Sequence, residues 1–118
     1  MQRKSSDSVR VFYPKFDKRE VIEAIDKKLE DLQKKLPLML VVLFGSYAKR
    51  NYTVASDVDL LVVYKGRERK EAYAVVKRTV DVFGLEPHVY SQAHYQQMKS
   101  TIDKMIKGGM VLFQNDRK

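Results

Sequence analysis

The stretch VVLFGSYAKRNYTVASDVDLLVVY, residues 41–64, contains two apolar runs that each have the length and composition of a buried strand. The first run ends at Gly45-Ser46, and the second begins with two aspartates, Asp57 and Asp59. A carboxylate that enters a core strand costs on the order of several kcal/mol of folding free energy unless its charge is compensated. The stretch therefore predicts a compensating partner for the two aspartates near the Gly-Ser end of the first strand.

The two aspartates have the spacing of a cation site. Because side chains alternate along a strand, Asp57 and Asp59 point to the same face, about 7 Å apart. Two carboxylates at that separation repel each other unless they share a cation. An oxygen-only pair in a chain without cysteine suits a hard ion, with Mg²⁺ as the first choice and Mn²⁺ as the second. The alternative is that Asp57 only caps the strand entrance and Asp59 pairs with a lysine.

The Gly-Ser that follows the first strand has the composition of a phosphate-binding turn. Gly45 lets the backbone approach an anion closely, and the Ser46 hydroxyl adds a donor to the exposed N–H groups. Lys49 and Arg50 lie just beyond and are candidates for phosphate contacts, or else are solvated charges. Taken alone, the turn also fits an ordinary strand-to-helix connection with Ser46 as N-cap. A phosphate cradle beside a pair of metal ligands is what phosphoryl and nucleotidyl transfer require.

The rest of the chain predicts a single α/β (α+β) domain without internal repeats. Residues 1–10 are polar and aperiodic, so we expect a mobile tail, with the domain spanning 11–118. Asp17 and Glu20 have the spacing of a helix capping box. The expected elements are a helix from there to Pro37, a strand at 38–44, a short helix from Ser46, a strand at 57–64, a helix at 67–82 with Phe83 on its apolar face, a strand at 85–90, a helix from the N-cap Ser91 to about 107, and a strand at 110–113.

Composition excludes several classes of protein. The chain has 118 residues and no cysteine, so it has neither disulfides nor a thiolate metal site, which fits a reducing cytoplasmic location. No apolar run approaches the roughly 20 residues of a membrane span, and the N-terminus lacks the apolar core of a secretory signal. Lys and Arg outnumber Asp and Glu by 23 to 15, and the net charge of +8 favours polyanionic partners such as nucleic acid, a triphosphate or an acidic protein.

At this point the residues carry a family resemblance. The motif GSYA, followed at a fixed distance by SDVDLLV, resembles the signature of the nucleotidyltransferase superfamily related to DNA polymerase beta. The chain is most similar to its small stand-alone group, the minimal nucleotidyltransferases of bacteria and archaea. The signature spans residues 45–63, and the order of elements fits to about Phe113. One departure is Lys49-Arg50-Asn51, where members of the family commonly have Arg-Gly-Glu.

The resemblance implies both a fold and a ligand set. The fold would be a mixed β-sheet with helices packed mainly on one side. Gly45 and Ser46 would hold the triphosphate of a nucleotide, and Asp57 and Asp59 would bind two magnesium ions.

The family places a third acid on the next strand, which is LEPHVY here, and Glu86 is the only carboxylate in that strand. Such a residue would hold the catalytic metal and accept the proton of the attacking hydroxyl. The alternative is a solvent-facing glutamate on an edge strand, which Pro87 predicts because proline donates no ladder hydrogen bond. His88 alternates onto the face of Glu86, where it either supplements Glu86 as a ligand or base, or is structural.

Two functions of different kinds follow from these residues and the resemblance. The first is a Mg²⁺-dependent nucleotidyltransferase that moves AMP from ATP, or another nucleoside monophosphate, to a hydroxyl. The resemblance implies a partner with a HEPN domain, with this chain as the antitoxin of a toxin–antitoxin pair. The second is a catalytically weak or inactive module that neutralises its partner by contact. A basic RNA-binding domain ranks last, because the chain lacks the aromatic-and-basic strand motifs of such modules.

Overall fold

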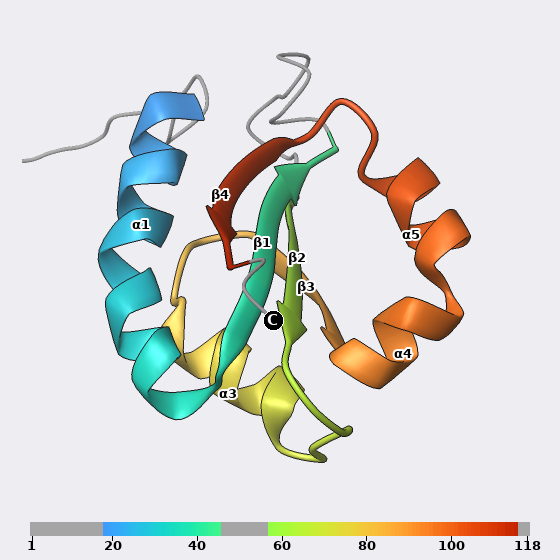
Figure 1. Cartoon of the computed structure of the whole chain (residues 1–118). Coiled ribbons are helices and arrows are strands. Elements are labelled where there is room, and N and C mark those ends of the chain that lie inside the picture. Colours follow the sequence, from blue (N-terminus) through green and yellow to red (C-terminus); the bar gives the residue numbers. More distant parts are fainter. Residues whose placement is uncertain (1–17, 46–56, 116–118) are drawn as a thin grey trace, which may run out of the picture.

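The computed structural model describes residues 18–45 and 57–115. In chain order its elements are α1 (Lys18–Lys35), β1 (Leu38–Phe44), β2 (Val58–Tyr64), α3 (Ala72–Thr79), β3 (Leu85–Ser91), α4 (Gln92–Gln97), α5 (Lys99–Met105) and β4 (Met110–Gln114), as Figure 1 shows. The expected tail at 1–10, the Asp17 capping position and the short helix from Ser46 lie outside the described residues.

The four strands form one mixed sheet in the order β3-β2-β1-β4. β1 pairs antiparallel with β2 and β4, whereas β2 and β3 run parallel and are joined by the crossover through α3. β1 occupies an interior position because its sequence, LMLVVLF, is apolar on both faces. β3 lies at an edge, as Pro87 predicted, because a strand that cannot donate every ladder hydrogen bond is tolerated there. The expected mixed sheet is confirmed.

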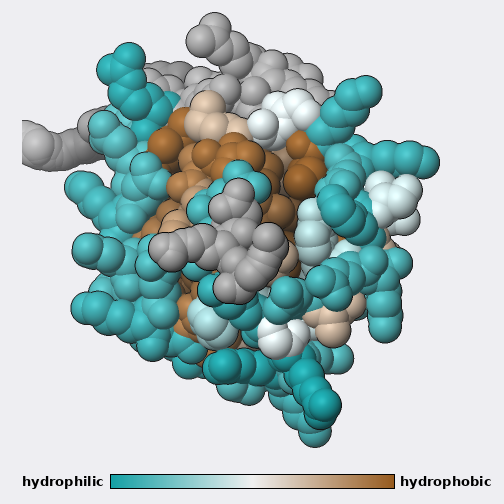
Figure 2. Space-filling model, in the orientation of Figure 1, coloured by the Kyte–Doolittle hydropathy of each residue, from teal (hydrophilic) through white to brown (hydrophobic). Residues whose placement is uncertain are grey.

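Each face of the sheet has its own core. The larger core lies under α1 and α3, where Ile25 and Leu32 are buried with Leu43 and Leu60 of the sheet. The opposite face carries a smaller cluster under α4 and α5 (Val42, Phe44, Leu61, Val63, Tyr95 and Ile102). Figure 2 shows hydrophilic outer surfaces on the helices and apolar side chains gathered between them over the sheet. No helix in the described part of the chain is long and apolar enough to cross a membrane.

Helix α3 is shorter than its apolar pattern predicted. The Tyr64 hydroxyl accepts a hydrogen bond from the Arg69 N–H at 2.7 Å, which holds the chain after β2 in a loop until Ala72. The helix ends at Thr79, and Gly84 then turns into β3 with a positive φ of 78°. Phe83, expected on the buried face of this helix, lies in the turn and is 74% exposed, so that expectation was wrong.

The last predicted helix is interrupted. Ser91 is its N-cap, as predicted, and accepts a hydrogen bond from the His94 N–H at 3.1 Å. Met98 (φ −113°, ψ 22°) separates α4 from α5. Across that break the Tyr95 hydroxyl donates to Asp103 Oδ1 at 3.1 Å, and the Lys99 ammonium donates to Asp103 Oδ2 at 2.9 Å. These side-chain contacts join the two short helices across Met98.

We expect Tyr95→Phe to lower the free energy of unfolding by about 1 kcal/mol at neutral pH, because it removes one side-chain hydrogen bond. Burial first, and then the hydrogen bond to Asp103, raise the pKa of Tyr95. The folded state therefore binds the phenol proton more tightly than the unfolded state. That stabilisation is present below the unfolded tyrosine pKa of about 10 and is lost as the pH rises through the folded pKa. Urea unfolding of the wild type and of Tyr95→Phe should show a difference in the free energy of unfolding that becomes smaller above about pH 10. A difference that does not change with pH would contradict the hydrogen bond between Tyr95 and Asp103.

Candidate active site

The glycine after β1 and the aspartate near the start of β2 lie side by side. Phe44 pairs with Asp59 in the antiparallel register, and Gly45 follows Phe44 with a φ of +80°. A Cβ built on Gly45 would overlap Asp59 Oδ2, the nearest atom to it. Residue 45 therefore has to be glycine for two reasons. Its backbone is left-handed, and the carboxylate of Asp59 occupies the space that a side chain would need.

The two aspartates lie at one end of the sheet. Leu61 and Val63 belong to the smaller cluster under α4 and α5, so by alternation Asp59 is on that same face. Asp59 is partly exposed, and Asp57 directly precedes β2 and is exposed. Both carboxylates are thus accessible from solvent at the end of the sheet where β1 finishes.

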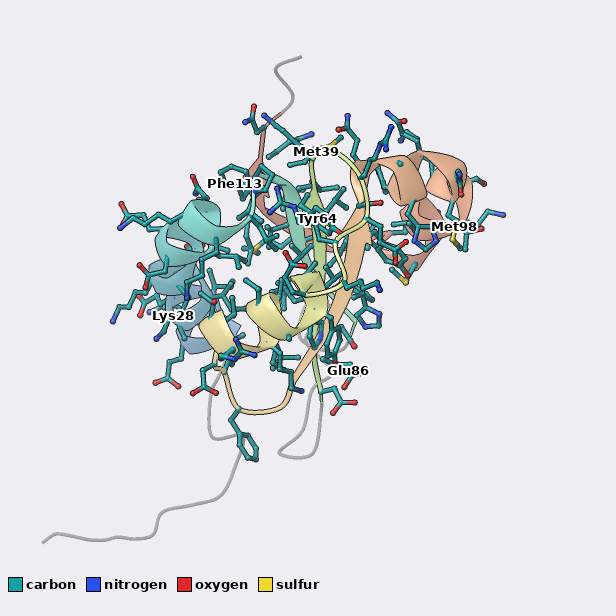
Figure 3. All side chains as sticks on the ribbon, turned by 90° about the horizontal axis from the view of Figure 1, so that it is seen from below. Lys28, Met39, Tyr64, Glu86, Met98 and Phe113 are labelled. Carbon is teal, nitrogen blue, oxygen red and sulfur yellow. The ribbon has the colours of Figure 1, made fainter. Side chains whose placement is uncertain are left out.

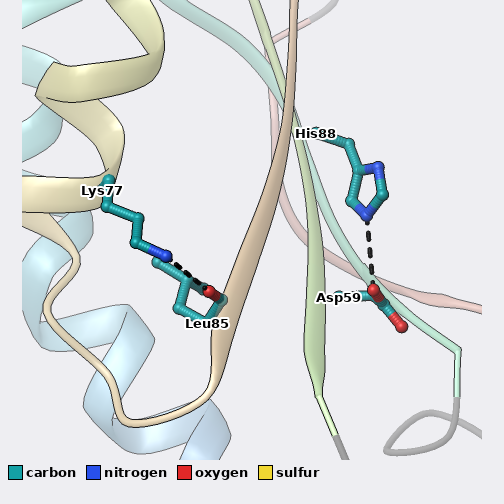
Figure 4. A network of polar contacts seen from close by, with 4 residues as sticks. All are labelled: Asp59, Lys77, Leu85 and His88. Atoms are coloured by element: carbon teal, nitrogen blue, oxygen red, sulfur yellow. Dashed lines mark hydrogen bonds and ion pairs between the residues drawn. The ribbon is translucent and has the colours of Figure 1, made fainter.

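The side-chain contact of Asp59 in the described part of the chain is with a histidine. His88 Nε2 lies 3.3 Å from Asp59 Oδ1, and the two side chains are 29% and 26% exposed (Figure 4). The ring of His88 also contacts the ring of Phe44, with centroids 5.0 Å apart and planes inclined by 58°. Among residues 18–45 and 57–115 the side-chain contact of Asp59 is with this histidine and not with a lysine.

Glu86 lies opposite Asp59 on the neighbouring strand, but the two do not form part of a cluster of potential metal ligands in the described part of the chain. The parallel register pairs Asp59 with Glu86, so both side chains belong to the same face of neighbouring strands. Glu86 is exposed, and Figure 3 shows it at the periphery of the molecule. Among residues 18–45 and 57–115, no three His, Asp or Glu side chains gather closely enough to form a metal site. The third-acid role of Glu86 stays a prediction.

Two contacts fix the start of β3 against its surroundings. The Val58 N–H donates to the Gly84 carbonyl at 2.9 Å, and Lys77 Nζ on α3 donates to the Leu85 carbonyl at 3.1 Å (Figure 4). A one-residue slip of β3 would turn its side chains to the other face. These contacts therefore help to hold the register that brings Glu86 and His88 to the face of Asp59.

The donor set fits a hard divalent cation. Asp57 and Asp59 supply carboxylate oxygens, which Mg²⁺ and Mn²⁺ prefer. The space beside Asp59 Oδ2 is free of any side chain from residue 45, because only a glycine fits there. The predicted phosphate-binding residues Ser46, Lys49 and Arg50 lie outside the described residues.

The His88–Asp59 contact is the feature that the sequence did not predict. Alternation placed His88 on the face of Glu86, but the contact depends on which strand lies beside β2 and in which register. The sequence did contain one indication of the contact. Glu86 and His88 are two residues apart on a strand that was expected to lie next to Asp59, so both were expected on the same face.

Known proteins are similar to this chain in family and in fold. The family model described as a nucleotidyltransferase domain matches residues 25–111. A candidate nucleotidyltransferase from Sulfolobus solfataricus has a similar structure, with a TM-score of 0.58, 19% identity, and 85% of this chain and 86% of that chain covered. No curated protein sequence is significantly similar to the chain.

Two structures of toxin–antitoxin complexes also have this fold. One contains AMP-PNP, with a TM-score of 0.53, 17% identity, and 77% of this chain and 74% of that chain covered. The other is the tri-AMPylated HEPN toxin of Shewanella oneidensis in complex with its MNT antitoxin, with a TM-score of 0.51, 15% identity, and 80% and 73% covered.

Proposed function

Since the chain belongs to the nucleotidyltransferase domain family, we propose that it transfers AMP from ATP to a hydroxyl group of a protein acceptor. The acceptor oxygen forms a bond to the α-phosphorus, and the bond from that phosphorus to the bridging oxygen breaks. Pyrophosphate leaves, and the acceptor retains the nucleoside monophosphate. The observation that carries the proposal is the bare backbone of Gly45 lying directly against the carboxylate of Asp59.

Each predicted site residue has a role in that reaction. The backbone at Gly45 and Ser46 binds the triphosphate, and Lys49 and Arg50 neutralise its charge. Asp57 and Asp59 would hold Mg²⁺, which when bound would supply polarisation of the α-phosphate and stabilisation of the charge that develops on the leaving pyrophosphate. Glu86, the carboxylate beside Asp59 on β3, takes the proton from the attacking hydroxyl.

We place the reaction in the cytoplasm, with a HEPN-domain toxin as the acceptor and this chain as its antitoxin. The support is the family membership together with the fold shared with chains from toxin–antitoxin complexes, one of them holding an AMPylated HEPN toxin. The net charge of +8 suits docking to an acidic partner.

Labelled ATP tests the chemistry directly. The protein is incubated with a candidate HEPN partner, Mg²⁺ and ATP carrying the label on either the α- or the γ-phosphate. Transfer of AMP puts the α-label on the partner and leaves the γ-label in pyrophosphate. Label from the γ-phosphate on the partner would indicate a kinase, and would contradict the proposal. An Asp57→Ala/Asp59→Ala double variant should transfer neither label.

The second candidate function, neutralisation by contact, is favoured by one observation. Glu86 is exposed and does not gather with Asp57 and Asp59 into a cluster. Contact alone would give a tight complex with the partner for both the wild type and the double variant, and label on neither.

Glu86→Gln tests whether Glu86 is the base of the transfer reaction. If Glu86 is the base, we expect the rate of AMP transfer to fall by about 10²- to 10⁴-fold. The free energy of unfolding should change by no more than about 0.5 kcal/mol, because the side chain is exposed. Glu68→Gln is the matched control, since Glu68 is exposed and follows the opposite end of β2. Equal transfer rates for both variants would remove Glu86 from the mechanism.

A further inference from the structure

The two carboxylate oxygens of Asp59 have different surroundings. Oδ1 lies 3.3 Å from His88 Nε2, whereas Oδ2 is the atom nearest to the vacant Cβ position of Gly45. A carboxylate held in this way cannot rotate freely about its last torsion without losing the contact to His88. Oδ1 therefore contacts His88 on β3, whereas Oδ2 faces the turn where β1 ends.

We propose that His88 is a positioning residue that donates its Nε2–H to Asp59 Oδ1 and so presents Oδ2 to the metal ion and nucleotide. The inference rests on the proposed function, and it adds to that function a task for His88. Partners of this kind orient the ligands of metal sites, and losing one typically costs 10- to 100-fold in metal affinity or activity.

His88 is itself built into the rigid part of the molecule. It lies on β3 opposite Leu61 of β2, and its ring packs against Phe44, the last residue of β1. His88 thus lies on β3, Phe44 on β1, and Asp59 on β2, which is the strand between these two. A site supported by strands in this way holds its geometry more closely than one on loops.

Two substitutions separate the donor from the ring. His88→Phe keeps a ring for Phe44 but has no donor for Asp59, and His88→Gln keeps an amide donor but has no ring. Both should remain folded, because the position is partly exposed. His94→Gln is the control, since His94 is an exposed histidine of α4 whose ring contacts Tyr90 and not Asp59.

The readout is Mn²⁺ binding in the presence of a non-hydrolysable ATP analogue, measured from the electron paramagnetic resonance signal of free Mn²⁺. We expect the dissociation constant to rise about 10- to 100-fold in His88→Phe and to return near the wild-type value in His88→Gln. His94→Gln should bind like the wild type. Wild-type affinity in His88→Phe would overturn the inference, as would equal losses in the Phe and Gln variants with intact thermal unfolding.

Two further results distinguish this inference from the proposed function. Hyperfine coupling from a nitrogen bound directly to Mn²⁺, present in the wild type and absent in His88→Phe, would make His88 a ligand and overturn the positioning role while the proposed function stands. No Mn²⁺ binding by the wild type would overturn both.

Discussion

An Asp59→Asn protein should transfer α-label to its partner about 10³-fold more slowly than the wild type while remaining folded. Removing the charge of a metal ligand forfeits roughly 4 kcal/mol of the stabilisation that a bound divalent ion gives the transition state, which corresponds to that factor. The fold should tolerate the change, because asparagine has the same shape and its amide oxygen still accepts from His88. The measurements are the initial rate of label transfer and the midpoint of urea unfolding.

Asp103→Asn is the matched control for that experiment. Asp103 is an exposed aspartate of α5 that also accepts a side-chain hydrogen bond, from Lys99 at 2.9 Å. Its substitution should leave the transfer rate unchanged. If Asp59→Asn retained more than a tenth of the wild-type rate, Asp59 would not be the residue that holds the ion.

Gly45→Ala should be strongly destabilising. A non-glycine residue at a φ of +80° costs about 1–2 kcal/mol, and forcing a methyl group against Asp59 adds about 1–3 kcal/mol. We expect the free energy of unfolding to fall by about 2–5 kcal/mol. Label transfer should disappear as well, because the methyl group displaces the carboxylate that holds the ion.

Gly66→Ala measures the loss of folding free energy that comes from a positive φ alone, without a steric clash. Gly66 has a φ of +90°, and a Cβ there would meet nothing within 4 Å. This variant should lose only about 1–2 kcal/mol and keep its transfer activity. Equal losses of stability in the two variants would mean that the contact between Gly45 and Asp59 has no energetic consequence.

The parts of the fold that were predictable from sequence are those with strong local signals. The unbroken apolar run before Gly45 predicted β1 with its observed bounds, Leu38–Phe44. The capping-box spacing of Asp17 and Glu20, together with Pro37, predicted the helix α1. The errors arose where side-chain contacts and turns override the periodic apolar pattern. The Tyr64 hydroxyl delays the start of α3, the turn before β3 carries Phe83 out to solvent, and Met98 divides the last helix into α4 and α5.

The candidate site also has one part that was predictable from local sequence and another part that was not. Two motifs on consecutive strands were enough to predict that Gly45 and the aspartates of β2 lie together. The contact of Asp59 with His88 depends on the register of β3, which in turn depends on the crossover through α3 and on the hydrogen bonds at Gly84 and Leu85. No local pattern in LEPHVY encodes that register. Alternation could therefore show that Glu86 and His88 share a face, but not which of them would touch Asp59.

The proposed function requires that Gly45, Asp57 and Asp59 form a metal–nucleotide site. Anomalous diffraction from crystals of the protein grown with Mn²⁺ and a non-hydrolysable ATP analogue would locate that site. We expect Mn²⁺ peaks bonded to the carboxylates of Asp57 and Asp59, with the triphosphate against the backbone of Gly45. Nucleotide bound elsewhere, for example on the basic loop after β2 (Lys65, Arg67, Arg69 and Lys70), with no Mn²⁺ at these aspartates, would refute the site.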